Sequence, residues 1–490
     1  MIRKLVCLFM ALTLLCAALP ALAAGDGETV DLIYLYSTDN FDPETDHTRQ
    51  IIREELGVNI IPEMGIEEEK LNLILMSGQE YDAIKMNYNM TLLATYIKNG
   101  AVQDLTDLVE AYGPNLKAAF PQEVWDMVSV DGRIYAIPET DSNDIENGIV
   151  VRQDWLDKLG LPLPETVDDF YNMLVAFSKM DPASVGVEYI IPFAATGVDS
   201  DLDFNGLVQA FGVASKAMDY VDVDGELKIS LDLPGEKDYL EFLHKLYKEG
   251  LLDSDFPATT HSALVEKVSS GVVGCAVMSC WDSSALRTLQ SNFEGSNLVF
   301  LKPLSKDGST PRIAARGGLK NFLIVPKASE KAAEVVKYCN DFLDDSHYMR
   351  LILGDEGTHY EVKDGVIYPL FPGFDAMNKG RWFYPTNDGA KYTPLFSVRA
   401  HKELEMGIMW DDLNNKGGEY KYVEITRFNP MLPEFTEYGN TLLVMARESL
   451  IKMIIDDAEM ARYDEFVTDW FAKGGRALAD AMNVWYQTQK

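Results

Sequence analysis

Aromatic and polar side chains gather where several apolar runs of strand length end. Trp281 and Asp282 follow the run from Val272 to Cys280, and a later segment supplies Arg381, Trp382 and Tyr384. The other residues of this kind are Tyr36, Asp39, Tyr88, Glu139, Asp141 and Arg152. Ligands of open α/β sheets bind beyond the carboxyl ends of the strands. These residues are therefore the candidate ligand contacts.

A site of this composition suits sugars. Neutral sugars present flat C–H faces flanked by hydroxyl groups, so their binding needs aromatic rings together with carboxylates, amides or guanidinium groups. Trp281 and Trp382 are the predicted stacking platforms, although a tryptophan after a strand also fits a packing role. Arg152 equally fits an ion pair between lobes. Glu139 and Asp141 also fit a solvated hinge loop.

Other chemistries have weaker support. The acidic stretch from Asp222 to Glu226 lacks the twelve-residue ligand spacing of a calcium loop and favours a hairpin turn. The six histidines form no His-x-x-x-His pair for zinc, and no Gly-x-Ser-x-Gly elbow or phosphate-binding glycine loop occurs. His359 fits a structural role. We therefore predict no metal site, no cofactor and no catalytic residue.

The first residues have the pattern of a secretory signal peptide. Arg3-Lys4 precedes an apolar run from Leu5 to Leu19, and Pro20-Ala21-Leu22-Ala23 offers a small-x-small cleavage site. We expect export to the periplasm or the outer face of the cell membrane, with a mature start at Ala24. Leu14-Leu15 before Cys16 lacks the small residue of a lipobox, so simple cleavage is favoured over lipidation. No later apolar run reaches membrane-spanning length.

Composition narrows the class of partner. The formal charge of −34 becomes −36 once Arg3 and Lys4 are removed, and lysine and arginine form no cluster. Such a surface repels nucleic acid and anionic lipid, so we exclude nucleic-acid binding. The 467 residues that follow residue 23 suffice for two or three domains. Cys275, Cys280 and Cys339 are predicted to be core residues without a disulfide.

Strand and helix patterns alternate along the chain. A strand from Val30 to Tyr36, a helix from Thr48 to Leu56 and a strand from Val58 to Ile61 form a β-α-β unit, which implies parallel pairing. Asp131-Gly132 marks a two-residue hairpin turn, and Thr166 is a predicted helix N-cap. The pattern indicates an α/β fold.

The order of these pieces resembles one family, the extracellular solute-binding proteins of ABC importers, in the long carbohydrate-type form of anaerobic bacteria. Each of these sequence pieces is common to many proteins, whereas their order along the chain is specific to the family. Together they cover nearly all of the mature chain. The pieces that carry the resemblance are Asn99 to Leu105, Asp131 to Glu139, Arg152 to Leu161, Leu207 to Gly212, Leu246 to Leu252, Gly271 to Trp281, Gly318 to Ser329, Gly354 to Tyr360, Gly474-Gly475 and Asn483 to Tyr486.

The resemblance implies a two-lobe periplasmic-binding-protein-like fold of type II with an interlobe cleft. Lobe 1 would hold residues 24–137 and 318–362, and lobe 2 residues 141–315 and 363–490. The segment from Lys363 to Pro430, rich in Gly, Pro and Asn, is predicted to be mostly loop.

The resemblance also implies a function. A monomeric protein would capture a carbohydrate, most simply an oligosaccharide, and deliver it to the membrane subunits of an ABC permease without turnover. Two alternatives stay open at this point. One is a binding protein for a peptide or another polar solute, in transport or in sensing, and the other is an exported glycoside hydrolase with two carboxylates about 5 to 10 Å apart.

Overall fold

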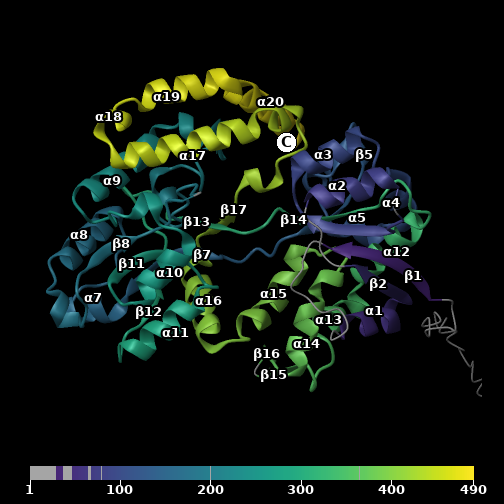
Figure 1. Ribbon diagram of the computed structural model, residues 1–490, viewed down its shortest axis with the longest axis horizontal. Coiled ribbons are helices and arrows are strands. Elements are labelled where there is room, and N and C mark those ends of the chain that lie inside the picture. Colours follow the sequence, from purple (N-terminus) through teal and green to yellow (C-terminus); the bar gives the residue numbers. More distant parts are fainter. Residues whose placement is uncertain (1–28, 37–46, 64–67, 79, 199, 364) are drawn as a thin grey trace, which may run out of the picture.

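The computed structural model describes residues 29–36, 47–63, 68–78, 80–198, 200–363 and 365–490. Two α/β lobes lie side by side, and a group of C-terminal helices crosses above both of them (Figure 1). The predicted two-lobe α/β fold is confirmed. The predicted signal peptide lies outside the described residues. No helix in the described part of the chain is long and apolar enough to cross a membrane.

The sheet of lobe 1 has five strands in the order β2-β1-β3-β14-β6. β1 pairs in parallel with β2 and β3, as the predicted β-α-β unit requires, whereas β14 is antiparallel to both of its neighbours. The bounds are β1 Val30–Tyr36, β2 Val58–Glu63, β3 Ala83–Asn87, β6 Ile137–Thr140 and β14 Leu319–Ile324. The carboxyl ends of β1, β3 and β6 therefore share one edge with the start of β14.

A small hairpin follows α6 in lobe 1, and helices surround the sheet. They are α1 Thr48–Leu56, α2 Glu68–Ser77, α3 Met90–Lys98, α4 Thr106–Tyr112, α5 Pro114–Ala119, α6 Gln122–Asp126, α12 Ala332–Phe342, α13 Asp345–Leu353, α14 Gly373–Lys379, the 3₁₀ helix η6 Gly380–Phe383 and α15 Gly389–Ala400. The hairpin β4 Ser129–Val130 and β5 Arg133–Ile134 turns at Asp131 (φ 51°) and Gly132 (φ 74°). The predicted Asp131-Gly132 turn is confirmed. A second short hairpin joins β15 Tyr360–Lys363 to β16 Val366–Pro369.

The sheet of lobe 2 has the order β12-β7-β11-β8. β7 is antiparallel to β11 and β12, and β8 is parallel to β11. The bounds are β7 Asn147–Arg152, β8 Ile191–Ala194, β11 Val273–Ser279 and β12 Leu298–Phe300. Its helices are α7 Gln153–Leu159, α8 Val167–Ser178, α9 Pro234–Lys248, α10 His261–Ser269, α11 Ser283–Asn292 and α16 Leu404–Gly417.

Short elements complete lobe 2. The hairpin β9 Tyr220–Val223 and β10 Glu226–Ile229 confirms the turn predicted for the acidic stretch, and β13 Ile313–Ala315 pairs in parallel with β17 Lys421–Val423. The 3₁₀ helices are η2 Pro182–Val185, η3 Val208–Phe211, η4 Ser230–Asp232, η5 Phe256–Ala258 and η7 Ile425–Phe428. α8 begins with a reciprocal capping box between Thr166 and Asp169, which confirms the predicted N-cap.

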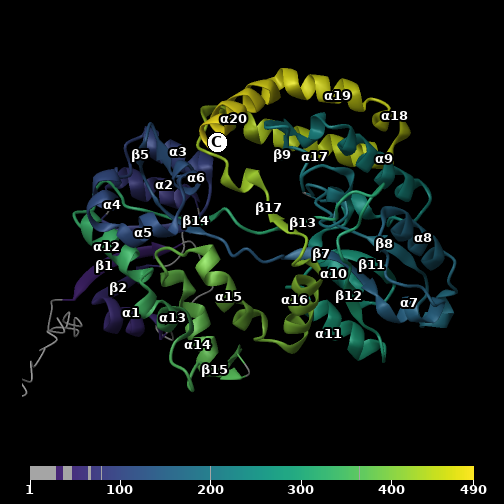
Figure 2. The ribbon, with the colours of Figure 1, turned by 180° about the vertical axis from the view of Figure 1, so that it is seen from behind.

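The C-terminal helices pack on lobe 2 and reach lobe 1 (Figure 2). They are the π-helical turn η8 Phe435–Gly439, α17 Asn440–Ile455, α18 Asp457–Met460, α19 Tyr463–Trp470, the π-helical turn η9 Phe471–Gly475 and α20 Arg476–Thr488. In α20, Asn483 Nδ2 donates to the Leu227 carbonyl in lobe 2 at 2.9 Å, and Trp485 Nε1 donates to Asp126 Oδ2 in lobe 1 at 3.3 Å. The last helix thus bonds to both lobes.

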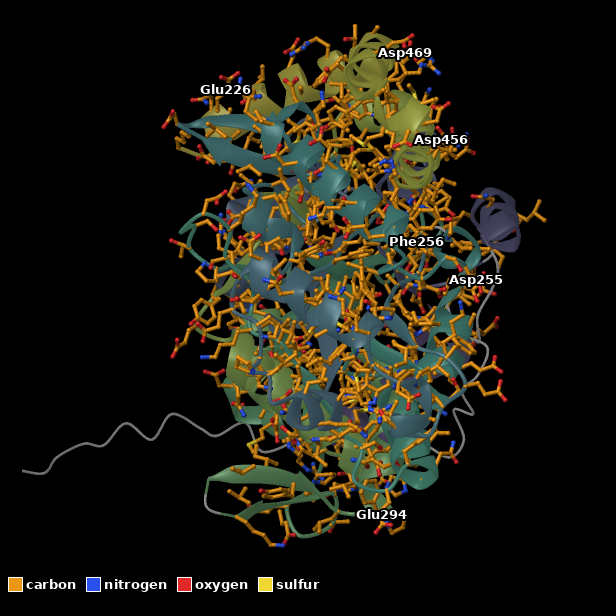
Figure 3. The ribbon with its side chains drawn as sticks, turned by 90° about the vertical axis from the view of Figure 1, so that its left-hand side faces the viewer. Glu226, Asp255, Phe256, Glu294, Asp456 and Asp469 are labelled. Carbon is orange, nitrogen blue, oxygen red and sulfur yellow. The ribbon has the colours of Figure 1, made fainter. Side chains whose placement is uncertain are left out.

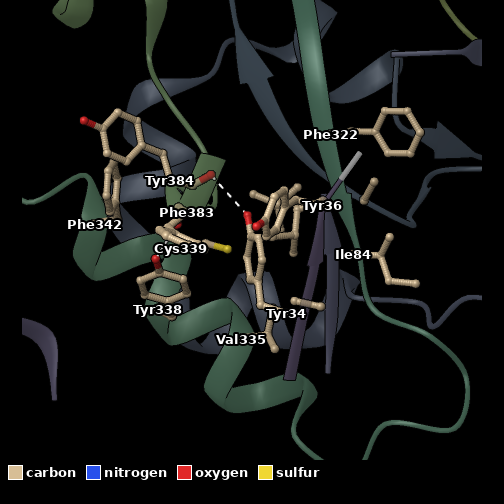
Figure 4. Packing of buried hydrophobic residues seen from close by; sticks show 14 of the residues in the cluster. Tyr34, Tyr36, Ile84, Phe322, Val335, Tyr338, Cys339, Phe342, Phe383 and Tyr384 are labelled. Carbon is tan, nitrogen blue, oxygen red and sulfur yellow. Dashed lines mark hydrogen bonds between the residues drawn. The ribbon is translucent and has the colours of Figure 1, made fainter. Parts of the chain in front are cut away.

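Each lobe has its own apolar core. The lobe 1 core includes Tyr34, which donates to the Tyr384 carbonyl at 3.3 Å, and Cys339 on α12 (Figure 4). Lobe 2 buries two clusters, one on each side of its sheet, and Cys275 and Cys280 lie in them. The three cysteines are buried and free, as predicted.

The segment after residue 363 differs from the prediction in two ways. It is largely helical, with α14, α15 and α16 in place of the expected loops. Its first part also packs in the lobe 1 core, through Phe374, Phe383 and Phe396, although the prediction assigned residues 363–490 to lobe 2. Gly and Pro in this segment lie mainly at helix ends, so composition alone misjudged its structure.

The outer surface is acidic. Glu226, Asp255, Glu294, Asp456 and Asp469 all lie exposed on the lobe 2 side of the molecule (Figure 3). This distribution agrees with the predicted repulsion of nucleic acid and anionic lipid.

A close approach in lobe 2 explains a glycine in β11. A Cβ atom on Gly274 would lie 2.6 Å from Phe177 Cδ2 and 2.8 Å from Trp155 Cζ3, which are buried ring atoms. We expect Gly274→Ala to lower the free energy of unfolding by about 1 to 3 kcal/mol, because the core must shift to admit the methyl group. Urea denaturation measures this. Gly439→Ala is the matched control, since its Cβ would meet nothing nearer than 3.9 Å. Equal loss in both variants would contradict the packing argument.

Candidate functional site

Two cavities meet where the chain passes from lobe 1 to lobe 2. The lobe 1 cavity, of about 60 Å³, is lined mainly by residues of β3, β6, β14, η6 and α15. The lobe 2 cavity, of about 270 Å³, is lined by residues at the ends of β7, β11 and β13. Asp141, which lies between the two sheets, lines both cavities. Together they form the candidate site.

Strand polarity explains why polar side chains converge here. In lobe 1, Asn87 and Thr140 end their strands at the shared edge, and Asn321 lies near the start of antiparallel β14. In lobe 2, Ser279 ends β11 and Asn147 begins antiparallel β7. Polar residues are stable at such edges because the strands stop there and leave room for solvent or ligand.

A buried ion pair organises the lobe 1 cavity. Lys85 Nζ lies 2.5 Å from Glu139 Oε2 and donates to the Tyr384 carbonyl at 2.7 Å. Asn321 Nδ2 donates to Glu139 Oε1 at 3.0 Å. Burial lowers the pKa of Lys85, while the Glu139 carboxylate opposes that shift. Glu139 is thus held in place by β3 and β14, and its predicted position beside a ligand is compatible with this geometry.

Cationic and aromatic groups of η6 and α15 also line this cavity. The Arg381 guanidinium lies 5.1 Å from the centre of the Trp382 ring, which is only partly buried. Burial, and then the nearby Arg399 charge, lower the pKa of Arg381 to about 10. Arg399 donates to the Tyr392 hydroxyl at 3.0 Å, and the Tyr384 hydroxyl donates to the Ile352 carbonyl at 3.1 Å.

Charged groups also link the two cavities. Asp141 Oδ1 lies 3.6 Å from Lys320 Nζ and 3.8 Å from Arg316 Nη1. Arg316 donates to Asp144 Oδ1 at 3.0 Å, and its guanidinium lies 4.7 Å from the centre of the Phe396 ring in lobe 1. The passage between the lobes is therefore held by a network in which one arginine meets several carboxylates.

The lobe 2 cavity contains a carboxyl group with an altered pKa. Burial raises the pKa of Asp203 to about 6, and the negative charge of Glu424 adds to this effect. Asp203 Oδ1 is buried without a hydrogen-bond partner among the described residues. The neighbouring Asn205 is fixed by two bonds to Ala314, one to its carbonyl and one from its backbone N–H, both at 2.9 Å.

A third cavity, of about 340 Å³, extends the boundary between the lobes. Met90 and Thr91 line it from the start of α3 in lobe 1. Asp201 and Lys216, which are 2.9 Å apart, line it from lobe 2 together with Arg447. The boundary thus carries several adjacent hollows rather than a single compact one.

Trp281 and Asp282 lie beside these cavities but line neither of the first two. Trp281 Nε1 donates to Glu146 Oε1 at 2.8 Å, and the Trp281 ring meets the Phe396 ring edge-on at 5.6 Å. Because Phe396 belongs to the lobe 1 core, Trp281 forms a contact between the lobes. Asp282 accepts from the Ser279 N–H and lies 2.9 Å from His261 Nε2, so its carboxylate closes the turn after β11.

Three other candidate residues lie elsewhere. Tyr36 is fully buried and meets the Phe383 ring edge-on at 5.6 Å, whereas Tyr88 packs edge-on against Phe322 at 6.0 Å. Arg152 is buried and forms two bonds with Asp154, at 2.8 and 2.6 Å. That pair lies within lobe 2, so Arg152 joins no interlobe ion pair among the residues that the structure describes. Asp39 lies outside the described residues.

The position of Arg152 has a simple cause. The prediction treated the end of β7 as part of the ligand-binding edge. β7 instead runs antiparallel to β11, so its carboxyl end, with Arg152, lies at the edge remote from the cavities. Five predicted residues do come together in the lobe 1 cavity: Glu139, Asp141, Arg381, Trp382 and Tyr384.

Sequence reasoning missed several residues that line the cavities. Arg316 precedes Gly317-Gly318 just before a strand, a signal that could have drawn attention to it. Arg399 lies within α15 and carried no such signal, because this helix was expected to be loop. Lys320, Asp203 and Asn205 were also missed, since their roles depend on contacts with distant segments.

The family of bacterial extracellular solute-binding proteins matches residues 61–340 of the chain. The chain belongs to this family. The solute-binding protein is also 29% identical over 323 residues to the fructooligosaccharide ABC transporter substrate-binding protein FusA of Streptococcus pneumoniae, a match that covers 62% of this chain and 57% of FusA. It is 23% identical to the polygalacturonan/rhamnogalacturonan-binding protein YtcQ of Bacillus subtilis, covering 86% of this chain and 84% of YtcQ.

Solved structures show the same fold. A solute-binding protein of Bifidobacterium longum infantis, described as binding HMO and associated with an ABC transporter, superposes on this one with a TM-score of 0.69 at 18% identity. The match covers 94% of this chain and 99% of that protein. The two proteins therefore share the two-lobe fold.

The pKa of Asp203 predicts a pH-dependent stability. Its pKa is about 6 when folded and about 3.9 in an unfolded chain, so between those pH values the folded protein binds more protons. Its contribution to stability therefore falls as pH rises from about 4 to 6, and ionisation in place costs about 3 kcal/mol above that range. We expect Asp203→Asn to raise the melting temperature at pH 8 but hardly at pH 4.

The control for this measurement is Asp480→Asn, since Asp480 is exposed on α20. Thermal unfolding at both pH values compares the two variants. An equal change at pH 4 and pH 8 for Asp203→Asn would contradict the assigned protonation of Asp203.

Proposed function

We propose that this solute-binding protein captures an extracellular oligosaccharide between its lobes and delivers it to an ABC permease. The observation that carries the proposal is the lobe 1 cavity, where Trp382 lies beside Arg381, Glu139 and Asp141 at the boundary with lobe 2. An aromatic ring next to charged hydrogen-bonding groups suits a sugar ring. The carbohydrates named for FusA and YtcQ support the same class of ligand.

The chain of cavities favours an oligomer over a single sugar. The lobe 1 and lobe 2 cavities share Asp141. Asp201 lines the third cavity and is two residues from Asp203, which lines the lobe 2 cavity. An extended ligand would contact both lobes at once, and such contacts stabilise a closed form over an open one. Trp281 and Arg316, which both touch Phe396, would move relative to lobe 1 when the lobes separate.

We further propose that the ligand leaves chemically unchanged and that the protein acts outside the cell, in the periplasm or at the outer face of the membrane. A glycoside hydrolase needs a general acid and a second carboxylate, both free to act. Glu139 is instead engaged by Lys85 and Asn321. Incubation with an oligosaccharide that binds should release no reducing ends, as a reducing-sugar assay would measure; release would favour the hydrolase.

Trp382→Ala tests the sugar-stacking role directly. We expect it to weaken binding of the preferred oligosaccharide by more than about 1 kcal/mol, the scale of an aromatic contact, as measured by isothermal titration calorimetry. The melting temperature should stay nearly unchanged, because the ring is only partly buried. Tyr189→Ala is the control, since Tyr189 is exposed outside the three cavities.

The ligand class itself is tested by a thermal-shift screen. A ligand that binds the native state raises the melting temperature by mass action. Shifts with oligosaccharides would support the proposal. Shifts only with peptides or other polar solutes would keep the fold and refute the sugar assignment.

A further inference from the structure

The lobe 1 cavity has the opposite charge balance from the protein as a whole. The chain carries a formal charge of −34. Among the described residues that line this cavity, however, four are cationic, namely Lys85, Lys320, Arg381 and Arg399, and only two are carboxylates, Glu139 and Asp141. A local excess of positive charge in a cavity favours the binding of a negatively charged group.

Both carboxylates already have cationic partners. Glu139 lies 2.5 Å from Lys85, and Asp141 lies between Lys320 and Arg316 at 3.6 and 3.8 Å. They therefore contribute little to neutralising Arg399. Arg399 therefore faces this small space without a carboxylate partner among the described residues, and Lys320 faces it with Asp141 as its partner at 3.6 Å.

Arg399 is the cation with the least compensation. The described residues provide it with one hydrogen bond, to the neutral Tyr392 hydroxyl, and with the Phe396 ring at 5.5 Å. Its Nε is buried without a hydrogen-bond partner in the described part of the chain. Burial and then the Arg399 and Arg381 charges lower the pKa of nearby Lys402, while Glu403 and Asp375 oppose that shift.

Arg399 is only partly buried, but its buried Nε lacks an acceptor among the described residues, and such a group is costly unless a ligand supplies the missing acceptor and charge. A guanidinium group matches a carboxylate especially well, because its donors form a planar fork. The size of the space agrees with this. The lobe 1 cavity, of about 60 Å³, is much smaller than the lobe 2 cavity of about 270 Å³, so it suits a compact group such as a carboxylate.

We propose that the lobe 1 cavity binds the carboxylate of an acidic sugar residue, with Arg399 and Lys320 as its cationic contacts. The ring that bears the carboxylate lies against Trp382, and the rest of the oligosaccharide extends toward the larger lobe 2 cavity. This inference rests on the proposed capture of an oligosaccharide and adds its chemical class: a saccharide that contains uronic acid.

Calorimetry with matched ligands tests the proposal. The purified protein is titrated with a panel of acidic trisaccharides built from galacturonate, mannuronate or glucuronate, with their methyl esters, and with neutral trisaccharides. The ester keeps the ring and removes the charge. We expect at least one acid to bind about tenfold or more tightly than its ester, with an affinity that falls as salt rises.

Arg399→Gln supplies the second readout, with Arg476→Gln as its control, because Arg476 is an exposed residue of α20. Arg399→Gln should lower the affinity for the acid about tenfold and reduce its preference over the ester, while Arg476→Gln leaves both unchanged. Thermal unfolding shows whether each variant is folded. Should Arg399→Gln unfold, Lys320→Gln takes its place, because Lys320 is partly exposed and outside the core.

The outcomes separate this inference from the proposed function. Neutral trisaccharides that bind while acids and esters do not, or acids and esters that bind equally, would overturn the acidic-sugar assignment and leave sugar capture intact. Absence of binding by every saccharide, acidic or neutral, would overturn both. Loss of acid preference in Arg399→Gln alone would establish the carboxylate contact.

Discussion

The buried pair of Lys85 and Glu139 is the interaction on which the candidate site depends. It joins β3 to β6 across β14, and Asn321 of β14 holds the same carboxylate. Lys85 also binds the Tyr384 carbonyl, so the pair anchors the segment that brings Arg381 and Trp382 to the sheet edge. Burying two charges is tolerable only when their remaining hydrogen-bonding groups are satisfied, and this network comes close to that condition.

The charged groups that line the cavities differ from those on the outer surface of the protein. Exposed carboxylates lie on the outer surface of lobe 2, whereas four cations line the lobe 1 cavity and the lobe 2 cavity contains Asp203 with a raised pKa. Both environments can occur in one protein because the cavities have a lower dielectric constant than water. Nearby charges therefore act more strongly on a group in a cavity than the distant, screened charges of the surface do. A ligand that spans both cavities would meet a positive group at one end and a carboxyl group at the other.

Several contacts between the lobes rest on single side chains. Trp281 and Arg316 approach Phe396 from the lobe 2 side, and Trp485 of the last helix bonds to Asp126 of lobe 1. Aromatic edges and single hydrogen bonds of this kind are weak enough to separate, while the two apolar cores stay intact. This division of stable cores and weaker boundary suits a protein that opens and closes around a ligand.

The sequence by itself determined the fold class, the β-α-β start of lobe 1, the hairpin at Asp131-Gly132 and the buried cysteines, because these follow from local periodicity and turn chemistry. It also singled out five residues of the lobe 1 cavity. Only the tertiary structure decided that Arg152 lies at the remote edge, since strand direction in a sheet is set by pairing partners far away in sequence. It likewise assigned α15, with Arg399, to lobe 1, because the packing of Phe396 in a distant core outweighs the loop-like composition around it.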